Sequence, residues 1–232
     1  MPTLTCFQHI DCEGPGTLEA ALEPLGLQLK ILKPFQGDAI PVDLGAGLVV
    51  LGGPMGVYEQ GQYPWMSGEL AAIRKALDAS LPILGVCLGS QMLAHAAGAQ
   101  VFRGALPEVG WRDISLTAAG KKDPLLTGLG ESFPVFHWHG DTFTLPKGAE
   151  LLAGSDWFPH QIFRIGEKAY GFQCHLEVTE AMVESWAQLY AKELVPAGGP
   201  TPEARVLEDL KRHSAQLEAL AAKVFTRFAK LI

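Results

Sequence analysis

The chain has 232 residues, of which 48% are hydrophobic and 19% are charged, a length and composition typical of a globular α/β domain with a large core. The net charge of −7 and the isoelectric point near 5.5 argue against nucleic acid as a partner and leave no basic patch for a membrane surface. No apolar run reaches the roughly 18 to 20 residues of a membrane span, and the N-terminus lacks the features of a secretory signal.

The four cysteines, Cys6, Cys12, Cys87 and Cys174, show no Cys-x-x-Cys spacing. In a chain of this size they do not form the pattern of a disulfide framework, so we expect a reducing, cytoplasmic setting. Without a cysteine pair, and with dispersed histidines, the sequence predicts no metal site, and we expect no cofactor.

In the first half of the chain, short apolar runs alternate with amphipathic stretches. Strands are expected at residues 4–10, 27–32, 47–51 and 82–86. Helices are expected from Thr17, as N-cap, to about residue 25, with Gly26 as a stop, and at residues 69–79. This order predicts an α/β fold with a mostly parallel, doubly wound sheet and helices on both faces.

The second half is less regular. Strands are expected at residues 111–116, 149–153, 160–165 and 168–175, with an apolar stretch at 133–139. A helix capped by Thr179 is expected to run to about residue 194, and an amphipathic helix or helix pair fills residues 203–232. A Pro/Gly-rich linker lies between them, so we expect one domain over residues 1–195 and a C-terminal helical extension, residues 196–232, packed on it.

Cys87 lies where an apolar strand passes directly into a helix, in the sequence Gly85-Val86-Cys87-Leu88-Gly89. This is the pattern of a nucleophile elbow, in which small flanking residues let strand and helix approach closely. The helix N-terminus favours the thiolate, which is the attacking species. The alternative is that Cys87 is a small buried hydrophobic residue, as most free cysteines are.

His175 and Glu177 lie two residues apart at the end of an expected strand. Residues two apart on extended backbone point to the same face, so the carboxylate can orient the imidazole. A base and its orienting group are what a cysteine nucleophile requires. The alternative is a surface pair without a catalytic role.

Four segments, in order along residues 45–190, resemble the motifs of the class I glutamine amidotransferase family, whose members have a Cys-His-Glu triad on a flavodoxin-like, doubly wound sheet. They are Gly52-Gly53-Pro54-Met55, Gly85-Val86-Cys87-Leu88-Gly89-Ser90-Gln91, Trp138-His139-Gly140-Asp141 and Gln173-Cys174-His175-Leu176-Glu177-Val178-Thr179. The resemblance is strongest to the free-standing, GMP-synthase-like members.

The resemblance implies that Cys87 attacks the side-chain amide of glutamine and forms a γ-glutamyl thioester. His175 would transfer protons and Glu177 would hold His175. The backbone N–H groups of Gly53 and Leu88 would form an oxyanion hole. Ammonia would be released for transfer to an acceptor.

Gln91 and the backbone around His137 and Trp138 would hold the amino-acid end of the substrate. Trp138 stands where the family pattern has serine, so substrate selection there is open. Leu176 replaces a proline between the histidine and the glutamate, and Cys174 replaces a phenylalanine and is expected to pack in the core.

Several functions remain open from the sequence. No ammonia-using synthetase domain is expected after residue 195, so the chain is a subunit that docks on a synthetase partner, a free glutaminase, or a γ-glutamyl peptidase with another amine as leaving group. A non-catalytic, amidotransferase-like subunit is a further alternative. An α/β-hydrolase is disfavoured, because there the acid precedes the histidine by a long stretch.

Overall fold

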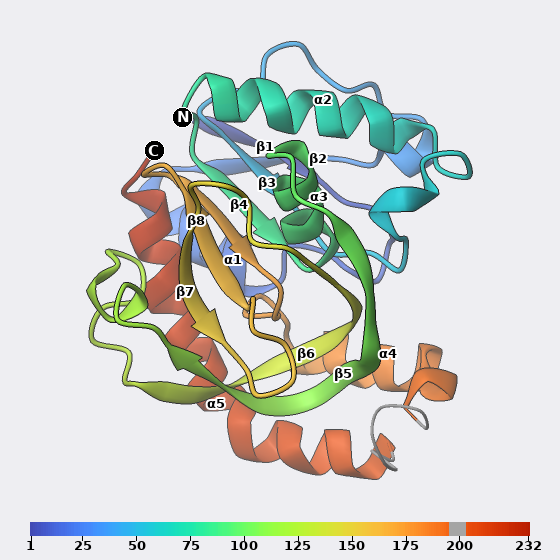
Figure 1. Ribbon diagram of the computed structural model, residues 1–232, viewed down its shortest axis with the longest axis vertical. Helices are drawn as coiled ribbons and strands as arrows, with labels where there is room; N and C mark the ends of the chain where they lie inside the picture. The colour runs from blue at the N-terminus through green and yellow to red at the C-terminus, as the bar shows by residue number, and fades with distance from the viewer. Residues whose placement is uncertain (195–202) are drawn as a thin grey trace.

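The computed structural model describes residues 1–194 and 203–232, and within them nine strands form a single sheet with helices on both faces (Figure 1). The strands are β1 (Thr3–Phe7), β2 (Gln28–Leu32), β3 (Gly47–Val50), β4 (Ile83–Val86), β5 (Val101–Leu116), β6 (Ser132–Phe143), β7 (Glu150–Gly154), β8 (Ile162–Ile165) and β9 (Ala169–Phe172). The α-helices are α1 (Thr17–Leu22), α2 (Trp65–Asp78), α3 (Leu88–Ala96), α4 (Glu180–Leu189) and α5 (Glu203–Ala229). Short 3₁₀ turns are η1 (Glu23–Leu25), η2 (Pro34–Gln36), η3 (Val57–Glu59), η4 (Gly120–Lys122) and η5 (Ala191–Glu193).

The sheet order is β2-β1-β3-β4-β9-β8-β7-β5-β6. The first five strands in this order, from β2 to β9, are parallel to one another. The remaining four, β8, β7, β5 and β6, continue the sheet with antiparallel pairing. The predicted doubly wound α/β fold is confirmed, and the antiparallel extension completes it. In such sheets the functional site lies beyond the carboxyl ends of the parallel strands, which here include β4 and β9.

Side chains of β3 alternate between two hydrophobic cores. Leu48 and Val50 pack with residues of α2 and α3, whereas Val49 packs with residues of α1, α4 and α5 on the other face. This alternation follows from the period of two in a strand, and it explains why the run at 47–51 is apolar throughout.

Helix α5 packs against α1, α4, β5 and β6, and its buried side chains, Phe225 and Phe228 among them, belong to the same core as the sheet residue Val49. The expected linker at 195–202, and with it the boundary between domain and extension, lies outside the described residues. In the part of the chain that the structure describes, no helix is both long and apolar enough to cross a bilayer.

Several element boundaries differ from the predictions. Strand β1 ends at Phe7, three residues early, and α2 begins four residues early, at Trp65. Strand β5 is longer than expected, and the apolar stretch at 133–139 lies within strand β6, which forms one long antiparallel pair with β5. Gly26 ends the first helical segment in the left-handed conformation, as predicted.

The N-cap of α1 is Gly16, and Thr17 is the first helical residue, so the prediction of Thr17 as the cap is wrong. Gly16 has φ +52°, and a Cβ there would lie 2.0 Å from the Glu177 carbonyl oxygen, so only glycine fits. The backbone N–H and the hydroxyl of Thr17 instead donate to that carbonyl oxygen, at 2.8 and 3.2 Å.

Candidate active site

Cys87 is the residue between β4 and α3, and its backbone has φ 50° and ψ −109°. A positive φ is strained for a residue with a side chain, so the surrounding structure must enforce it. The backbone N–H of Cys87 donates to the Phe172 carbonyl oxygen at 2.7 Å. The elbow predicted from the sequence is therefore present, and it holds the thiol beyond the carboxyl end of β4.

The flanking glycines are required by close backbone approach. A Cβ on Gly85 would lie 2.5 Å from the Gly89 carbonyl oxygen, and a Cβ on Gly89 would lie 1.9 Å from the Val50 carbonyl oxygen. No larger side chain fits at either position without moving strand or helix. The tight packing of α3 on β3 and β4 thus follows from the Gly-x-Cys-x-Gly sequence.

His175 and Glu177 form a buried hydrogen-bonded pair, with 2.7 Å between His175 Nδ1 and Glu177 Oε1. The predicted strand up to His175 is too long, because β9 ends at Phe172, level with the elbow. His175 then pairs with β6 through a bridge to Phe136, whose carbonyl accepts its N–H at 2.8 Å. A bend, rather than extended backbone, therefore brings imidazole and carboxylate together.

The Cys87 thiol and the His175 imidazole lie near enough for each to shift the pKa of the other. Since Nδ1 of His175 is bound to Glu177, Nε2 is the ring nitrogen left to accept the thiol proton. Both side chains lie over Gly52, where a Cβ would be 3.3 Å from His175 Cε1 and 3.6 Å from Cys87 Cβ. The structure thus brings together the three residues that the sequence predicts as nucleophile, base and orienting acid.

Burial raises the pKa of the Cys87 thiol, with a further increase from the charges of Glu13 and Glu177, and His175 opposes this increase. Burial alone would lower the pKa of His175, but Glu177 and Cys87 outweigh it and hold that pKa well above its usual range. The imidazole lowers the pKa of the thiol and the thiolate raises the pKa of the imidazole, so each group favours the charged form of the other.

Gly53 and Leu88 lie beside the thiol, in the turn after β3 and at the first position of α3. Across residues 1–194 and 203–232, neither backbone N–H donates to a backbone carbonyl oxygen. A Cβ on Gly53 would lie 3.0 Å from Leu88 Cδ2, so the two segments are in contact. The arrangement is suited to an oxyanion hole, and this role remains a prediction.

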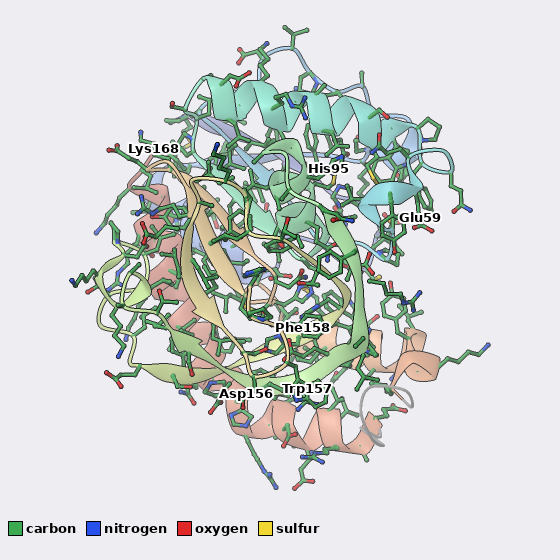
Figure 2. All side chains as sticks on the ribbon, viewed as in Figure 1. Glu59, His95, Asp156, Trp157, Phe158 and Lys168 are labelled. Carbon is green, nitrogen blue, oxygen red and sulfur yellow. The ribbon has the colours of Figure 1, made fainter. Side chains whose placement is uncertain are left out.

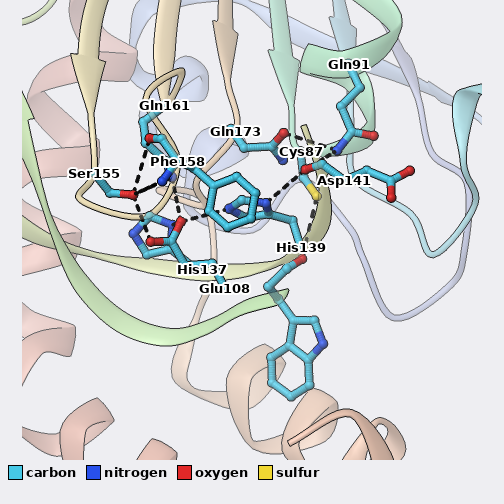
Figure 3. Close-up of polar contacts among 11 residues, drawn as sticks. Cys87, Gln91, Glu108, His137, His139, Asp141, Ser155, Phe158, Gln161 and Gln173 are labelled. Atoms are coloured by element: carbon cyan, nitrogen blue, oxygen red, sulfur yellow. Dashed lines mark hydrogen bonds and ion pairs between the residues drawn. The ribbon is translucent and has the colours of Figure 1, made fainter. Parts of the chain in front are cut away.

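A cavity of about 440 Å³ opens next to Cys87 and His175, within the range of small-molecule sites. Gln91 lines it, and its Nε2 donates to Gln173 Oε1 at 3.1 Å and to the Asp141 carbonyl at 3.4 Å (Figure 3).

The two other residues predicted to hold substrate lie in β6, and they differ in their placement. Trp138 lines the cavity, and its carbonyl oxygen lies 3.7 Å from Cys87 Sγ. His137 does not line the cavity, because its side chain is buried beside Glu108, whereas His139 reaches the cavity from the same strand.

Glu13 is a cavity residue that the sequence analysis did not predict. It lies in the loop after β1, where the Gly-Pro-Gly segment indicates only a connection. Its side chain is buried and lines the cavity, and a Cβ on Gly52 would lie 2.4 Å from Glu13 Oε2. The available signal was its position after a parallel strand, at the sheet edge where functional sites form.

Within the described part of the chain, one group of side chains has the donors of a metal site, namely Glu108, His137 and His139. Glu108 Oε2 lies 3.1 Å from His139 Nε2 and already accepts from Gln161 Nε2 at 2.6 Å, and Ser155 donates to Oε1 at 2.8 Å (Figure 3). Burial would raise the pKa of Glu108, but the hydrogen bond from His139 and the charges of both histidines lower it to about 2. We interpret the group as a buried polar network that supports β5 and β6, and the absence of a metal remains a prediction.

The loop between β7 and β8 covers this network. Trp157 and Phe158 lie side by side in this loop (Figure 2). Phe158 packs edge-on against His139, with 4.6 Å between ring centroids (Figure 3), and the Arg112 guanidinium lies 3.6 Å from the centroid of the Trp157 ring. His95 lies on α3 and does not line the cavity.

A thiol on a strained elbow, faced by a histidine–carboxylate pair at the carboxyl edge of a doubly wound sheet, defines a thiol-dependent hydrolase or transferase site. A match to the family described as glutamine amidotransferase class-I covers residues 9–185. The chain belongs to the class I glutamine amidotransferase family.

Similar proteins agree with this assignment. The glutamine amidotransferase-like protein YfeJ of Salmonella typhimurium is 36% identical over 196 residues, which cover 82% of each protein. A glutamine-hydrolysing GMP synthase of Porphyromonas gingivalis is 39% identical over 145 residues, covering 61% of this chain but only 27% of the synthase. The chain thus spans about a quarter of that relative's length.

Two crystal structures have the same fold over nearly their whole length. A glutamine amidotransferase of Thermotoga maritima is 31% identical, with a TM-score of 0.88 over 99% of this chain and 98% of that one. A glutamine amidotransferase of Methylobacillus flagellatus is 29% identical, with a TM-score of 0.92 over 100% and 96%.

Proposed function

We propose that the protein hydrolyses the side-chain amide of glutamine through a γ-glutamyl thioester and releases ammonia for transfer to an acceptor. The observation that carries this proposal is the meeting of Cys87 with the His175–Glu177 pair over the Gly52 turn, in a chain of this family. The cavity beside these residues supplies space for a small substrate.

In the first half of the reaction, His175 Nε2 takes the thiol proton as the Cys87 sulfur attacks the amide carbon. The resulting oxyanion is stabilised by the N–H groups of Gly53 and Leu88, and one such donor contributes about 2.7–4 kcal/mol. His175 then donates this proton to the leaving nitrogen as the carbon–nitrogen bond breaks. Ammonia departs, and the γ-glutamyl thioester remains on Cys87.

In the second half, water attacks the thioester carbon and gives a proton to His175. The carbon–sulfur bond then breaks, and the proton returns to sulfur, so glutamate is released and the thiol is restored. Glu177 keeps Nδ1 of His175 protonated throughout, which leaves Nε2 free for both transfers.

At the substrate's amino-acid end, we assign binding roles to Gln91 and to the backbone around His137 and Trp138. Gln91 lines the same cavity as Cys87, and the Trp138 carbonyl oxygen lies 3.7 Å from Cys87 Sγ, which supports this assignment, whereas the His137 side chain takes no part in it. The Asp141 carbonyl, next to Gln91, is a further acceptor at this end.

We propose that a synthetase chain receives the ammonia, because the relatives that this chain matches over about a quarter of their length are GMP synthases. All four cysteines are free thiols, in keeping with the cytoplasmic setting that we propose.

The proposal is tested by ammonia release from glutamine, measured with the full chain and with Cys87→Ala. We expect turnover by the wild type and a loss of about 10³-fold or more in the variant. Equal release by both proteins, from glutamine and from a panel of γ-glutamyl dipeptides and glutathione, would contradict an enzymatic function. A higher kcat/KM for the γ-glutamyl peptides than for glutamine would instead identify a γ-glutamyl peptidase.

A further inference from the structure

A second histidine–carboxylate pair lies behind the turn that follows β3. His9 comes from the segment after β1 and Glu69 from α2, and both side chains are completely buried. His9 Nε2 lies 2.9 Å from Glu69 Oε2, and His9 Nδ1 lies 2.9 Å from the Gly52 carbonyl oxygen. The function proposed above assigns no role to either side chain.

The partners of His9 determine where its protons are. A carbonyl oxygen can only accept, so Nδ1 carries a hydrogen and donates it to Gly52. The other nitrogen faces a carboxylate, and one further proton must lie between Nε2 and Glu69. Burial would lower the pKa of His9, but Glu69 and the Gly52 carbonyl outweigh it and raise that pKa, which favours the imidazolium form.

The Gly52 carbonyl and the Gly53 N–H belong to the same peptide unit. In a planar trans peptide these two groups point in opposite directions. A hydrogen bond that holds the carbonyl toward His9 therefore turns the Gly53 N–H away from His9. No cis peptide bond occurs in the described residues, so this relation holds at Gly52-Gly53.

Two successive glycines leave this peptide free to rotate, because neither has a Cβ to restrict its backbone. His9 itself is fixed on three sides: by Glu69, by the Gly52 carbonyl, and by Trp65, whose ring stacks on it at 5.4 Å with an interplanar angle of 17°. A Cβ on Gly53 would lie 2.9 Å from His9 Cβ, so the imidazole packs directly behind the turn.

We propose that His9 and Glu69 are positioning residues, which hold the Gly52–Gly53 peptide so that its N–H serves as an oxyanion donor. This inference rests on the proposed function, in which Gly53 supplies that donor. A charge-assisted bond to the carbonyl is about twice as strong as a neutral one. It also polarises the peptide and strengthens the opposite N–H as a donor.

The test compares His9→Leu, which removes the donor, with His9→Asn, whose Nδ2 can replace Nδ1. If the inference is right, His9→Leu lowers kcat for the best substrate of the panel by about 10²-fold or more, as loss of an oxyanion donor does. KM changes less than about threefold, and kcat of His9→Asn is at least about tenfold higher than kcat of His9→Leu. His95→Leu on α3 is the matched control and keeps wild-type kcat.

A second measurement separates positioning from unfolding. Alkylation of Cys87 by iodoacetamide needs the thiol and His175 but no oxyanion donor. We expect His9→Leu to retain the wild-type alkylation rate within about twofold while kcat falls. Parallel losses of alkylation and kcat would assign His9 a purely structural role and overturn the inference, as would an unchanged kcat in folded His9→Leu.

Glu69→Gln supplies an independent test if His9→Leu does not fold. The glutamine side chain can still hydrogen-bond to His9, but it no longer favours the imidazolium, so we expect kcat to fall about tenfold. Wild-type kcat in Glu69→Gln and His9→Asn alike would contradict the charge-assisted clamp. Turnover by the wild type, lost in Cys87→Ala, upholds the proposed function in either case, so the two ideas fail separately.

Discussion

The backbone N–H of Cys87 donates a 2.7 Å hydrogen bond to the carbonyl oxygen of Phe172. This bond extends the parallel ladder between β4 and β9, in which Val86 lies opposite Phe172, by one step into the elbow. His175 follows three residues later. Thiol and imidazole therefore follow the ends of two neighbouring central strands, and backbone hydrogen bonds, from Cys87 to Phe172 and from His175 to Phe136, fix both segments.

Replacement of Glu177 by glutamine tests the electrostatic role of the acid. Burial favours neutral His175, and the Glu177 carboxylate reverses this and raises the pKa of His175. Without the carboxylate that pKa falls, so the acidic limb of the pH–rate profile moves to lower pH. We expect kcat/KM near neutral pH to fall about 10²- to 10⁴-fold, because the base loses its orientation. Glu180→Gln, at an exposed site in α4, is the control, and an acidic limb that stays in place or moves upward would contradict the prediction.

Replacement of Glu13 by glutamine tests the effect of its charge on the thiol. Burial and the charges of Glu13 and Glu177 all raise the pKa of Cys87, so Glu13→Gln lowers it and increases the thiolate fraction at neutral pH. We expect iodoacetamide to alkylate Cys87 about threefold faster, the change given by half a pKa unit. Peptide-resolved mass spectrometry measures the rate, and exposed Glu23→Gln is the control. Slower or unchanged alkylation would rule out this electrostatic effect.

Gly89→Ala tests the close approach of α3 to β3. The added methyl group would lie 1.9 Å from the Val50 carbonyl oxygen, so helix and strand must separate. We expect the free energy of unfolding to fall by about 3 kcal/mol or more, measured by urea denaturation. Gly61→Ala adds the same methyl group where no atom lies within 4 Å, and its stability should match the wild type. Equal free energies of unfolding for the two variants would show that α3 does not approach β3 closely at Gly89.

Phe225→Ala tests the proposal that the C-terminal extension and the rest of the chain form one folding unit. Phe225 is buried in the core shared by α5 and the sheet, so its truncation should cost about 3–5 kcal/mol. Unfolding should remain a single transition, whether followed by circular dichroism or by Cys87 accessibility. Lys223→Ala, an exposed neighbour, should change little. A separate early transition of α5 would identify the extension as an independent unit.

The sequence predicted most readily what is encoded locally. The change from an apolar run to helical spacing around Cys87, together with two glycines, specified the elbow, and the doubly wound order followed from alternating strands and helices. The full length of β5 was missed because its first residues are exposed and include Gly104 and Pro107, which do not resemble a strand.

The other differences have long-range causes. Strand β9 ends at Phe172 because its neighbour β4 turns into the elbow there, a constraint that residues 168–175 do not contain. Glu13 and His9 follow β1, and their functional surroundings come from β3, α2 and the segment after β9. A single acidic residue or histidine in a loop carries no spacing signal, so only the folded chain shows what it contacts.

The two hydrogen bonds from Thr17 to the Glu177 carbonyl oxygen link segments that lie 160 residues apart in the sequence. During synthesis on the ribosome, Cys87 emerges long before His175 and Glu177. Until Glu177 has been made, Thr17 has no carbonyl oxygen at that position to which it can donate. A chain that stops before residue 175 thus carries a thiol without its base, and the catalytic residues can assemble only after the segment through Glu177 has been translated.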